Sequence, residues 1–167
     1  NIGIFNRSKY LLEFFNCLDF VHIKSILRVM VKKVVLVGGC FDVLHPGHII
    51  FLQKAKAAGD YLIVLLESDE RIKKLKGIKR PVHDQKMRAL MLYAVRYVDQ
   101  VISLPDLKKD EDYEKIVAKI KPDIIAVTKG GSDYHHEKRV AKLVGAELKY
   151  VTKMIGNYST TAILNRK

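Results

Sequence analysis

The sequence predicts an α/β fold in which a parallel sheet of five strands is covered by helices on both faces. From Lys33 onward, short apolar runs rich in Val, Ile and Leu alternate with segments that carry apolar residues at helical spacing. Continuous apolar runs indicate strands buried on both faces, as in parallel sheets with crossover helices. In such doubly wound sheets, ligands bind at the carboxyl ends of the strands, near the point where the strand order reverses.

Turn and capping residues place the elements along the chain. Pro46 begins the first helix and Gly59 follows its end. Asp84 caps the second helix, Pro122 stops the third and Gly145 ends the fourth. We expect strands at 34–37, 61–66, 98–104, 124–127 and 147–151, helices at 46–58, 84–97, 110–120 and 135–144, and a short last helix capped by Ser159.

The first 30 residues differ from the rest. Phe14, Phe15 and Leu18 recur at roughly helical spacing, and Met30 directly precedes the first predicted strand. We interpret residues 1–30 as an N-terminal extension, helical in part, outside the main domain at 31–167. The alternative is an amphipathic helix that packs on a partner subunit.

Composition narrows the class of partner. Lys and Arg number 30 against 18 Asp and Glu, a formal net charge of +12, which favours nucleic acid, acidic membranes or phosphorylated metabolites. The lysines are scattered and Trp is absent, so a stripe of basic and aromatic residues for nucleic acid is not indicated. Two cysteines without metal or disulfide spacing favour a reducing cytoplasm. No apolar run is long enough to cross a bilayer.

The segment after the first strand carries the chemistry. It reads GCFDVLHPGH from Gly39 to His48, which places His45 at the start of a helix and His48 one turn inside. A spacing of three residues puts both rings on one face. Free N–H groups at the helix start attract phosphate, and imidazoles can donate hydrogen bonds to phosphoryl oxygens. Each residue alone is more often a cap or a turn residue, but together they predict a phosphate site.

This segment resembles the signature of the cytidylyltransferase-like nucleotidyltransferases. The likeness continues to about Leu164, and its further matches are Lys76-Gly77, Lys79-Arg80-Pro81, Arg88, Lys129-Gly130-Gly131 and Ser159-Thr160-Thr161. The resemblance implies a Rossmann-like fold and an enzyme that transfers a nucleotide from ATP or CTP to a phosphorylated acceptor and releases pyrophosphate. It also implies Mg²⁺ bound with the triphosphate rather than by a dedicated metal site, and a homodimer without nucleic-acid or membrane partners.

The resemblance also implies roles for individual residues. His45 and His48 would contact the nucleotide phosphates, while Lys76 and Arg88 would bind phosphates of either substrate. The implied catalytic residues are His45, His48, Lys76 and Arg88. The implied nucleotide-binding residues are Gly39, Cys40, Phe41, Asp42, Gly47, Lys129, Gly130, Gly131, Ser159 and Thr160. For Ser159, an ordinary helix cap and a phosphate contact are both expected.

Within that family, the pattern resembles the heptose-phosphate adenylyltransferase type of lipopolysaccharide core biosynthesis. Gly-Cys-Phe-Asp at 39–42, Leu75-Lys76-Gly77 before Arg80-Pro81, and Lys129-Gly130-Gly131 point there. Ser132 and the segment 156–158 depart from it. The resemblance thus implies transfer of AMP from ATP to a sugar phosphate such as heptose 1-phosphate. An FAD synthase, with FMN as acceptor, and a glycerol-phosphate cytidylyltransferase stay open as alternatives, and a nucleic-acid-binding module is the alternative from another class.

Overall fold

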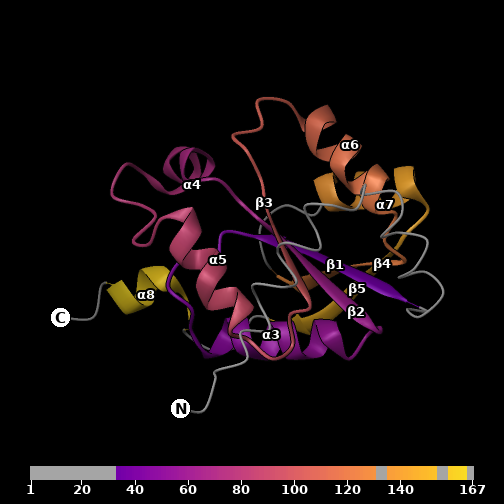
Figure 1. Ribbon diagram of the computed structural model, residues 1–167, viewed down its shortest axis with the longest axis horizontal. Helices are drawn as coiled ribbons and strands as arrows, with labels where there is room; N and C mark the ends of the chain where they lie inside the picture. The colour runs from indigo at the N-terminus through magenta and orange to yellow at the C-terminus, as the bar shows by residue number, and fades with distance from the viewer. Residues whose placement is uncertain (1–32, 131–134, 154–157, 165–167) are drawn as a thin grey trace, which may run out of the picture. The chain divides into compact units, whose positions relative to one another are not determined.

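Five parallel strands form one sheet in the order β3-β2-β1-β4-β5 (Figure 1). The computed structural model describes residues 33–130, 135–153 and 158–164, so the predicted extension at 1–30 lies outside the described residues. The strands are β1 (Val34–Gly39), β2 (Tyr61–Leu66), β3 (Gln100–Ser103), β4 (Ile124–Lys129) and β5 (Glu147–Lys153). The helices are α3 (Pro46–Lys56), α4 (Asp69–Lys76), α5 (Gln85–Tyr93), α6 (Asp110–Ile120), α7 (His135–Val144) and α8 (Thr160–Leu164).

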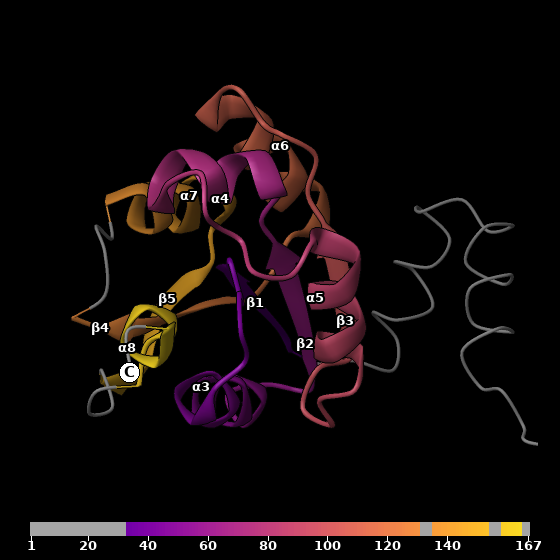
Figure 2. The ribbon, with the colours of Figure 1, turned by 90° about the vertical axis from the view of Figure 1, so that its left-hand side faces the viewer.

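The helices cover both faces of the sheet, which confirms the predicted fold class. Alternate residues of β1 point to opposite faces. Val35 and Val37 pack with Leu52 of α3 and Leu92 of α5 in one core, whereas Leu36 belongs to a second core with residues of α6 and α7. Figure 2 shows α3 below the sheet, with α6 and α7 above it. Burial on both sides explains why the central strands read as unbroken apolar runs.

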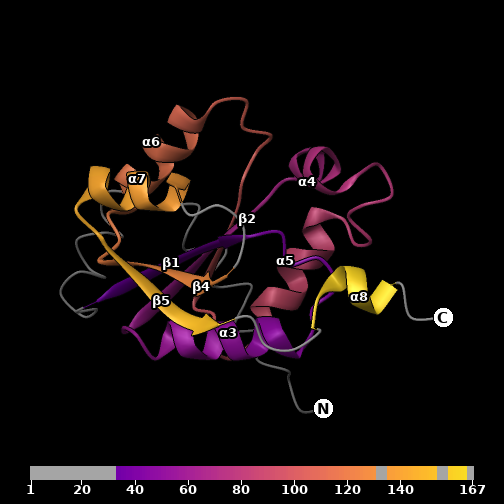
Figure 3. The same ribbon diagram turned by 180° about the vertical axis from the view of Figure 1, so that it is seen from behind.

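The strand order reverses between β1 and β4. The chain runs outward from β1 through β2 to β3, and then returns to place β4 on the other side of β1. All strands are parallel, so their carboxyl ends meet at one edge of the sheet. Figures 1 and 3 show α4 and α8 at that edge. The site is therefore expected there, at the topological switch point.

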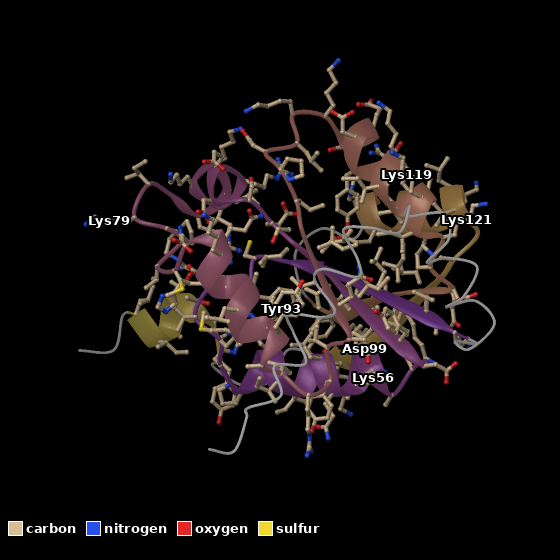
Figure 4. All side chains as sticks on the ribbon, viewed as in Figure 1. Lys56, Lys79, Tyr93, Asp99, Lys119 and Lys121 are labelled. Atoms are coloured by element: carbon tan, nitrogen blue, oxygen red, sulfur yellow. The ribbon has the colours of Figure 1, made fainter. Side chains whose placement is uncertain are left out.

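The opposite, amino-end edge is closed by carboxylates. Asp99 Oδ2 accepts a hydrogen bond from the Leu62 backbone N–H at 2.6 Å. The same oxygen forms an ion pair with Lys56 Nζ, also at 2.6 Å. Figure 4 shows Lys56 and Asp99 side by side, close to where α3 ends. Asp123 Oδ2 accepts from the Val34 N–H at 2.7 Å in the same way. These bonds satisfy backbone donors where the strands begin.

Most predicted elements are present with small shifts at their ends. The helices predicted at 110–120 and 135–144 have those bounds, and α3 ends at Lys56 rather than at residue 58. Asp84 caps α5 as predicted, since its Oδ1 accepts from the Met87 N–H at 2.8 Å. The helix ends at Tyr93 rather than at residue 97, because the Val95 N–H bonds back only three residues, to the Leu92 carbonyl at 3.0 Å.

Helix α4 was not predicted. The sequence predicts no element between the strand at 61–66 and the helix at 84–97, but residues 69–76 form a helix. Ser68 caps it by accepting from the Arg71 N–H at 3.1 Å, and acidic residues fill the first turn while Lys73, Lys74 and Lys76 fill the last. Gly77 follows with a φ of 92°. Those start and stop signals are present in the sequence and identify the helix.

None of the helices in the described ranges is long and apolar enough to cross a membrane.

Candidate functional site

The loop that follows β1 has an unusual backbone. Phe41 has a φ of 44° and Val43 a φ of 55°, in the left-handed region that non-glycine residues seldom adopt. For a β-branched residue such as Val43 this conformation is a true outlier, which persists only where surrounding contacts fix it. Strain of this kind concentrates at functional sites.

Asp42, between these two residues, supplies the contacts that fix the loop. Its carboxylate is buried and accepts from Arg80 Nε at 2.5 Å and from the backbone N–H groups of Val82 at 2.9 Å and His83 at 3.3 Å. Its backbone carbonyl accepts from the Thr160 hydroxyl of α8. Asp42 therefore joins three segments that are distant in the sequence, and in this state its carboxylate is bound by protein donors.

His45 and His48 stack face to face at the start of α3. Their ring centroids lie 3.7 Å apart with an interplanar angle of 21°, and Phe41 packs against His48 with centroids 5.3 Å apart. The spacing of three residues therefore places both rings together, as predicted. Gly47 makes room for this arrangement, since a Cβ built there would lie 3.1 Å from the His45 ring.

Both imidazoles are neutral at pH 7. Burial, the neighbouring His45 and the Lys76 ammonium together lower the pKa of His48 to about 3, and only the Asp42 carboxylate acts in the opposite direction. Burial, and then Lys76, also lower the pKa of His45. Lys76 is the last residue of α4, so the missed helix brings its ammonium group close to the histidine pair. The result is a site with two neutral N–H donors beside one cation.

The depressed His48 pKa predicts a pH-dependent stability. The unfolded chain binds a proton on His48 below its ordinary pKa of 6.5, whereas the folded chain does not until about pH 3, so stability falls as pH falls through this window. Between pH 7.5 and 5.0, the wild type should lose about 2 kcal/mol more unfolding free energy than His48→Gln. Urea denaturation at a series of pH values measures this. His83→Gln, at an exposed histidine, is the control, and equal pH slopes for wild type and His48→Gln would contradict the assignment.

The Arg88 side chain, predicted to bind phosphate, makes its hydrogen bonds to groups of the protein itself. It is fully buried, and its guanidinium donates to the carbonyls of Cys40 at 2.6 Å, Glu67 at 2.8 Å and His83 at 3.0 Å, and to Asp69 Oδ1 at 2.7 Å. These bonds tie the ends of β1 and β2 to the start of α4. In this state Arg88 holds the loops that carry the histidines, and direct phosphate binding by Arg88 stays a prediction.

Several buried side-chain nitrogens of the site make no hydrogen bond to the described residues. His45 Nδ1, His48 Nδ1 and one terminal nitrogen of Arg80 are buried without a hydrogen-bond partner among the described residues. Leaving such groups unsatisfied costs free energy, which a bound ligand can recover. Because the guanidinium and Lys76 are positively charged, an anion such as phosphate fits these donors. Arg80 is thus a site residue that the sequence analysis quoted only as part of a motif.

A second group of cations lies where β4 and β5 end. Lys129 and Lys153 occupy paired positions on these neighbouring strands, and such like charges repel unless an anion lies near. Gly130 follows with a φ of 85°, which a glycine adopts without strain. Gly131 lies outside the described residues. Lys153 was not among the predicted residues.

The residues at α8 have structural contacts in this state. Ser159 caps the helix, since its hydroxyl oxygen accepts from the Ala162 N–H at 3.0 Å, as expected of an N-cap. The Thr160 side chain is buried and donates to Asp42, so it holds the loop that precedes the histidines. Their predicted phosphate contacts stay predictions.

The remaining lysines are spread over the surface. In Figure 4, Lys79 lies at the outer edge of the segment between α4 and α5, while Lys119 and Lys121 lie on the far side of the molecule near the end of α6. Other basic side chains pair with neighbouring acids, as Lys74 does with Asp106 at 3.3 Å. Among the described residues, these basic side chains therefore do not form the single continuous stripe that nucleic-acid binding would favour.

No group of three or more His, Cys, Asp or Glu side chains in the described part of the chain is placed to hold a metal ion.

Comparison with known proteins gives a consistent family. Residues 36–166 match the family described as cytidylyltransferase-like. A bifunctional protein HldE of Helicobacter pylori strain J99 is 41% identical over 138 residues, covering 81% of this chain and 27% of the relative. The protein of the same name from Wolinella succinogenes is 42% identical over 135 residues, with the same coverage. This chain thus spans about a quarter of the length of these curated relatives.

A solved structure supports the same family. The crystal structure of the lipopolysaccharide core biosynthesis protein from Thermoplasma volcanium aligns with a TM-score of 0.59 and 29% identity. The alignment covers 74% of this chain and 96% of that protein.

Proposed function

Because the chain belongs to the cytidylyltransferase-like family and is a nucleotidyltransferase, we propose that it transfers the adenylyl group of ATP to a sugar phosphate such as heptose 1-phosphate. The observation that carries the reaction class is the stacked pair of neutral histidines, with buried unpartnered nitrogens, beside Lys76 at the start of α3. The choice of acceptor is supported by the sequence pattern at 39–42 and 75–81. It is also supported by the relatives named HldE and by the similar structure of a lipopolysaccharide core biosynthesis protein.

The chemistry needs positioning and charge neutralisation more than a strong base. An oxygen of the acceptor phosphate, already anionic, forms a bond to the α-phosphorus of ATP. The bond from that phosphorus to the bridging oxygen breaks, and pyrophosphate leaves with the electron pair. His45 and His48 would each donate an N–H to phosphate oxygens, and Lys76 would offset their negative charge. The fixed loop at 41–43 keeps the two rings in place before substrate arrives.

Mg²⁺ is proposed to enter with the triphosphate. It would bridge phosphate oxygens and neutralise part of their charge. The Asp42 carboxylate, the one nearest in sequence to the histidine pair, accepts three hydrogen bonds from Arg80, Val82 and His83, which fits a metal held mainly by the nucleotide. The Mg²⁺ requirement, the homodimer and the cytoplasmic location stay predictions.

A pyrophosphate-release screen tests the proposal. The chain is incubated with Mg²⁺ and each of ATP, CTP, GTP and UTP, against heptose 1-phosphate, FMN and glycerol 3-phosphate. We expect ATP with heptose 1-phosphate to exceed every other pair by at least about tenfold in kcat/KM, since the enzyme selects by its transition-state contacts.

Other results of the screen would identify one of the alternative functions. ATP with FMN as the best pair would identify an FAD synthase, and CTP with glycerol 3-phosphate a cytidylyltransferase. Release from no pair, together with submicromolar binding of short DNA or RNA at physiological salt, would replace the enzyme by a nucleic-acid-binding module.

A further inference from the structure

A second group of polar side chains lies at the carboxyl ends of the strands, on the face covered by α6 and α7. Glu67 directly follows β2, and its N–H donates to the Gly39 carbonyl at 3.1 Å. Tyr113, near the start of α6, packs on the His136 ring of α7 with centroids 5.0 Å apart. The Tyr113 hydroxyl also reaches the end of β1, since a Cβ built on Gly38 would lie 3.0 Å from it. Three elements thus converge beside the switch point between β1 and β4.

Ion pairs between α6 and α7 hold this group in place. Arg139 of α7 binds Asp110 and Glu114 of α6, each at 2.9 Å. Asp110 Oδ2 also lies 3.6 Å from Nδ1 of His136. The two helices that carry Tyr113 and His136 also share one apolar core, and this packing together with the partly exposed ion pairs sets their relative position, as a preorganised binding site requires.

The group is rich in hydrogen-bond acceptors. Burial raises the pKa of Tyr113, and the carboxylates of Glu67 and Glu137 raise it further. Burial also raises the pKa of Glu67. Glu137 Oε2 is buried without a hydrogen-bond partner among the described residues. Arg71 and His136 lie near Glu67 and partly offset its negative charge, so a neutral ligand that can donate hydrogen bonds, as hydroxyl groups do, suits these acceptors.

Cys40, directly after β1, is close enough to both groups for charges of each to act on its thiol. Burial raises the pKa of its thiol, the nearby Lys76 lowers it and the nearby Glu67 raises it. The carboxyl edge of the sheet therefore has a basic half, around His45, His48 and Lys76, next to a half rich in acceptors, around Glu67 and Tyr113. A molecule with a phosphate at one end and hydroxyl groups at the other fits both halves at once.

We propose that Glu67, Tyr113 and His136 form a subsite that binds the hydroxyl groups of the acceptor and so select a polyhydroxylated phosphate. The inference rests on the proposed function, which places the acceptor phosphate against the histidine pair. Each carboxylate oxygen accepts from a hydroxyl group, while the phenol and the imidazole can each donate or accept. A substrate without these hydroxyl groups leaves the buried acceptors unpaired, which is the basis of strong discrimination.

Steady-state kinetics with heptose 1-phosphate and MgATP tests the subsite. Tyr113→Phe and Glu67→Gln should each raise KM for heptose 1-phosphate about tenfold, with kcat and KM for MgATP changed less than about twofold, because they remove contacts to the acceptor alone. The matched control is Tyr61→Phe at the opposite edge of the sheet, which should leave all three constants unchanged. Binding of heptose 1-phosphate in the presence of a non-hydrolysable ATP analogue is measured in parallel by calorimetry.

The two readouts separate the subsite from the reaction. Normal KM for heptose 1-phosphate in both folded variants would overturn the subsite and leave the proposed function standing. Binding without pyrophosphate release, weakened about tenfold in both variants, would overturn the proposed function and support the subsite. A wild type that neither binds nor turns over heptose 1-phosphate would overturn both. If one variant does not fold, the other decides, with its melting temperature as the check.

Discussion

Replacing His48 by alanine should lower the turnover number at least about a hundredfold while the dissociation constant of MgATP changes much less. Hydrogen-bond donors placed where charge develops act mainly in the transition state, and removing one typically costs a factor of a hundred to a thousand. His48 is suited to this role, because its ring is held between His45 and Phe41 and its low pKa keeps it uncharged at pH 7. Single-turnover kinetics measure the chemical step, and calorimetry measures nucleotide binding.

A second substitution separates chemistry from packing. His48→Phe keeps an aromatic ring between His45 and Phe41 but has no N–H to donate, so it should be about as inactive as His48→Ala. A phenylalanine variant with near-normal turnover would limit His48 to packing, and so would a folded alanine variant with near-normal turnover. Loss of MgATP binding in both variants would instead show that His48 serves ground-state binding.

The architecture could be predicted from the sequence because each strand is buried on both faces. The apolar runs that give β1, β2 and β4 have no polar alternation that would allow another register, and Asp84 and Gly145 mark helix ends by their own chemistry. Helix α4 was missed because its apolar residues are few. Only Ile72 is buried, so the helix shows little periodicity and depends on its Ser68 cap and its charge pattern.

The candidate site could be predicted only in part, for a different reason. His45 and His48 lie in one helix, so their spacing along the chain fixes their distance in space. Arg80 meets Asp42, and Tyr113 meets Gly38, only through tertiary packing between elements that the sequence does not pair. The sequence shows which residues carry a charge or a hydrogen-bonding group. It does not show which neighbours will pair with those groups in the folded protein.

Arg88 shows this limit most clearly, and its replacement should have the largest effect on stability. Arg88→Met removes a buried cation that donates to three carbonyls and to the Asp69 carboxylate. Its loss leaves three backbone carbonyls and the partly exposed Asp69 carboxylate without their donor, and we expect the unfolding free energy to fall by about 3–5 kcal/mol. Urea denaturation measures the loss. Arg96→Met is the matched control, because Arg96 is exposed and its polar interactions are with the side chain of its neighbour Tyr97, so its loss should cost about 1 kcal/mol or less.

The same experiment separates a structural arginine from a phosphate ligand. A lysine has one compact charged group and cannot reproduce the planar fork that reaches four acceptors, so Arg88→Lys should regain little of the lost stability. If Arg88 serves phosphate alone, both variants should instead unfold like the wild type while KM for MgATP or the acceptor rises. Should Arg88→Met not fold at all, Asp69→Asn removes the charged partner but keeps one side-chain oxygen that can accept from Arg88 or from the Gln85 N–H, so it should cost less than Arg88→Met. Unchanged stability in both Asp69→Asn and Arg88→Lys would show that the hydrogen bonds of Arg88 do not stabilise the loops after β1 and β2. Direct binding of substrate phosphate would then be the better account of Arg88.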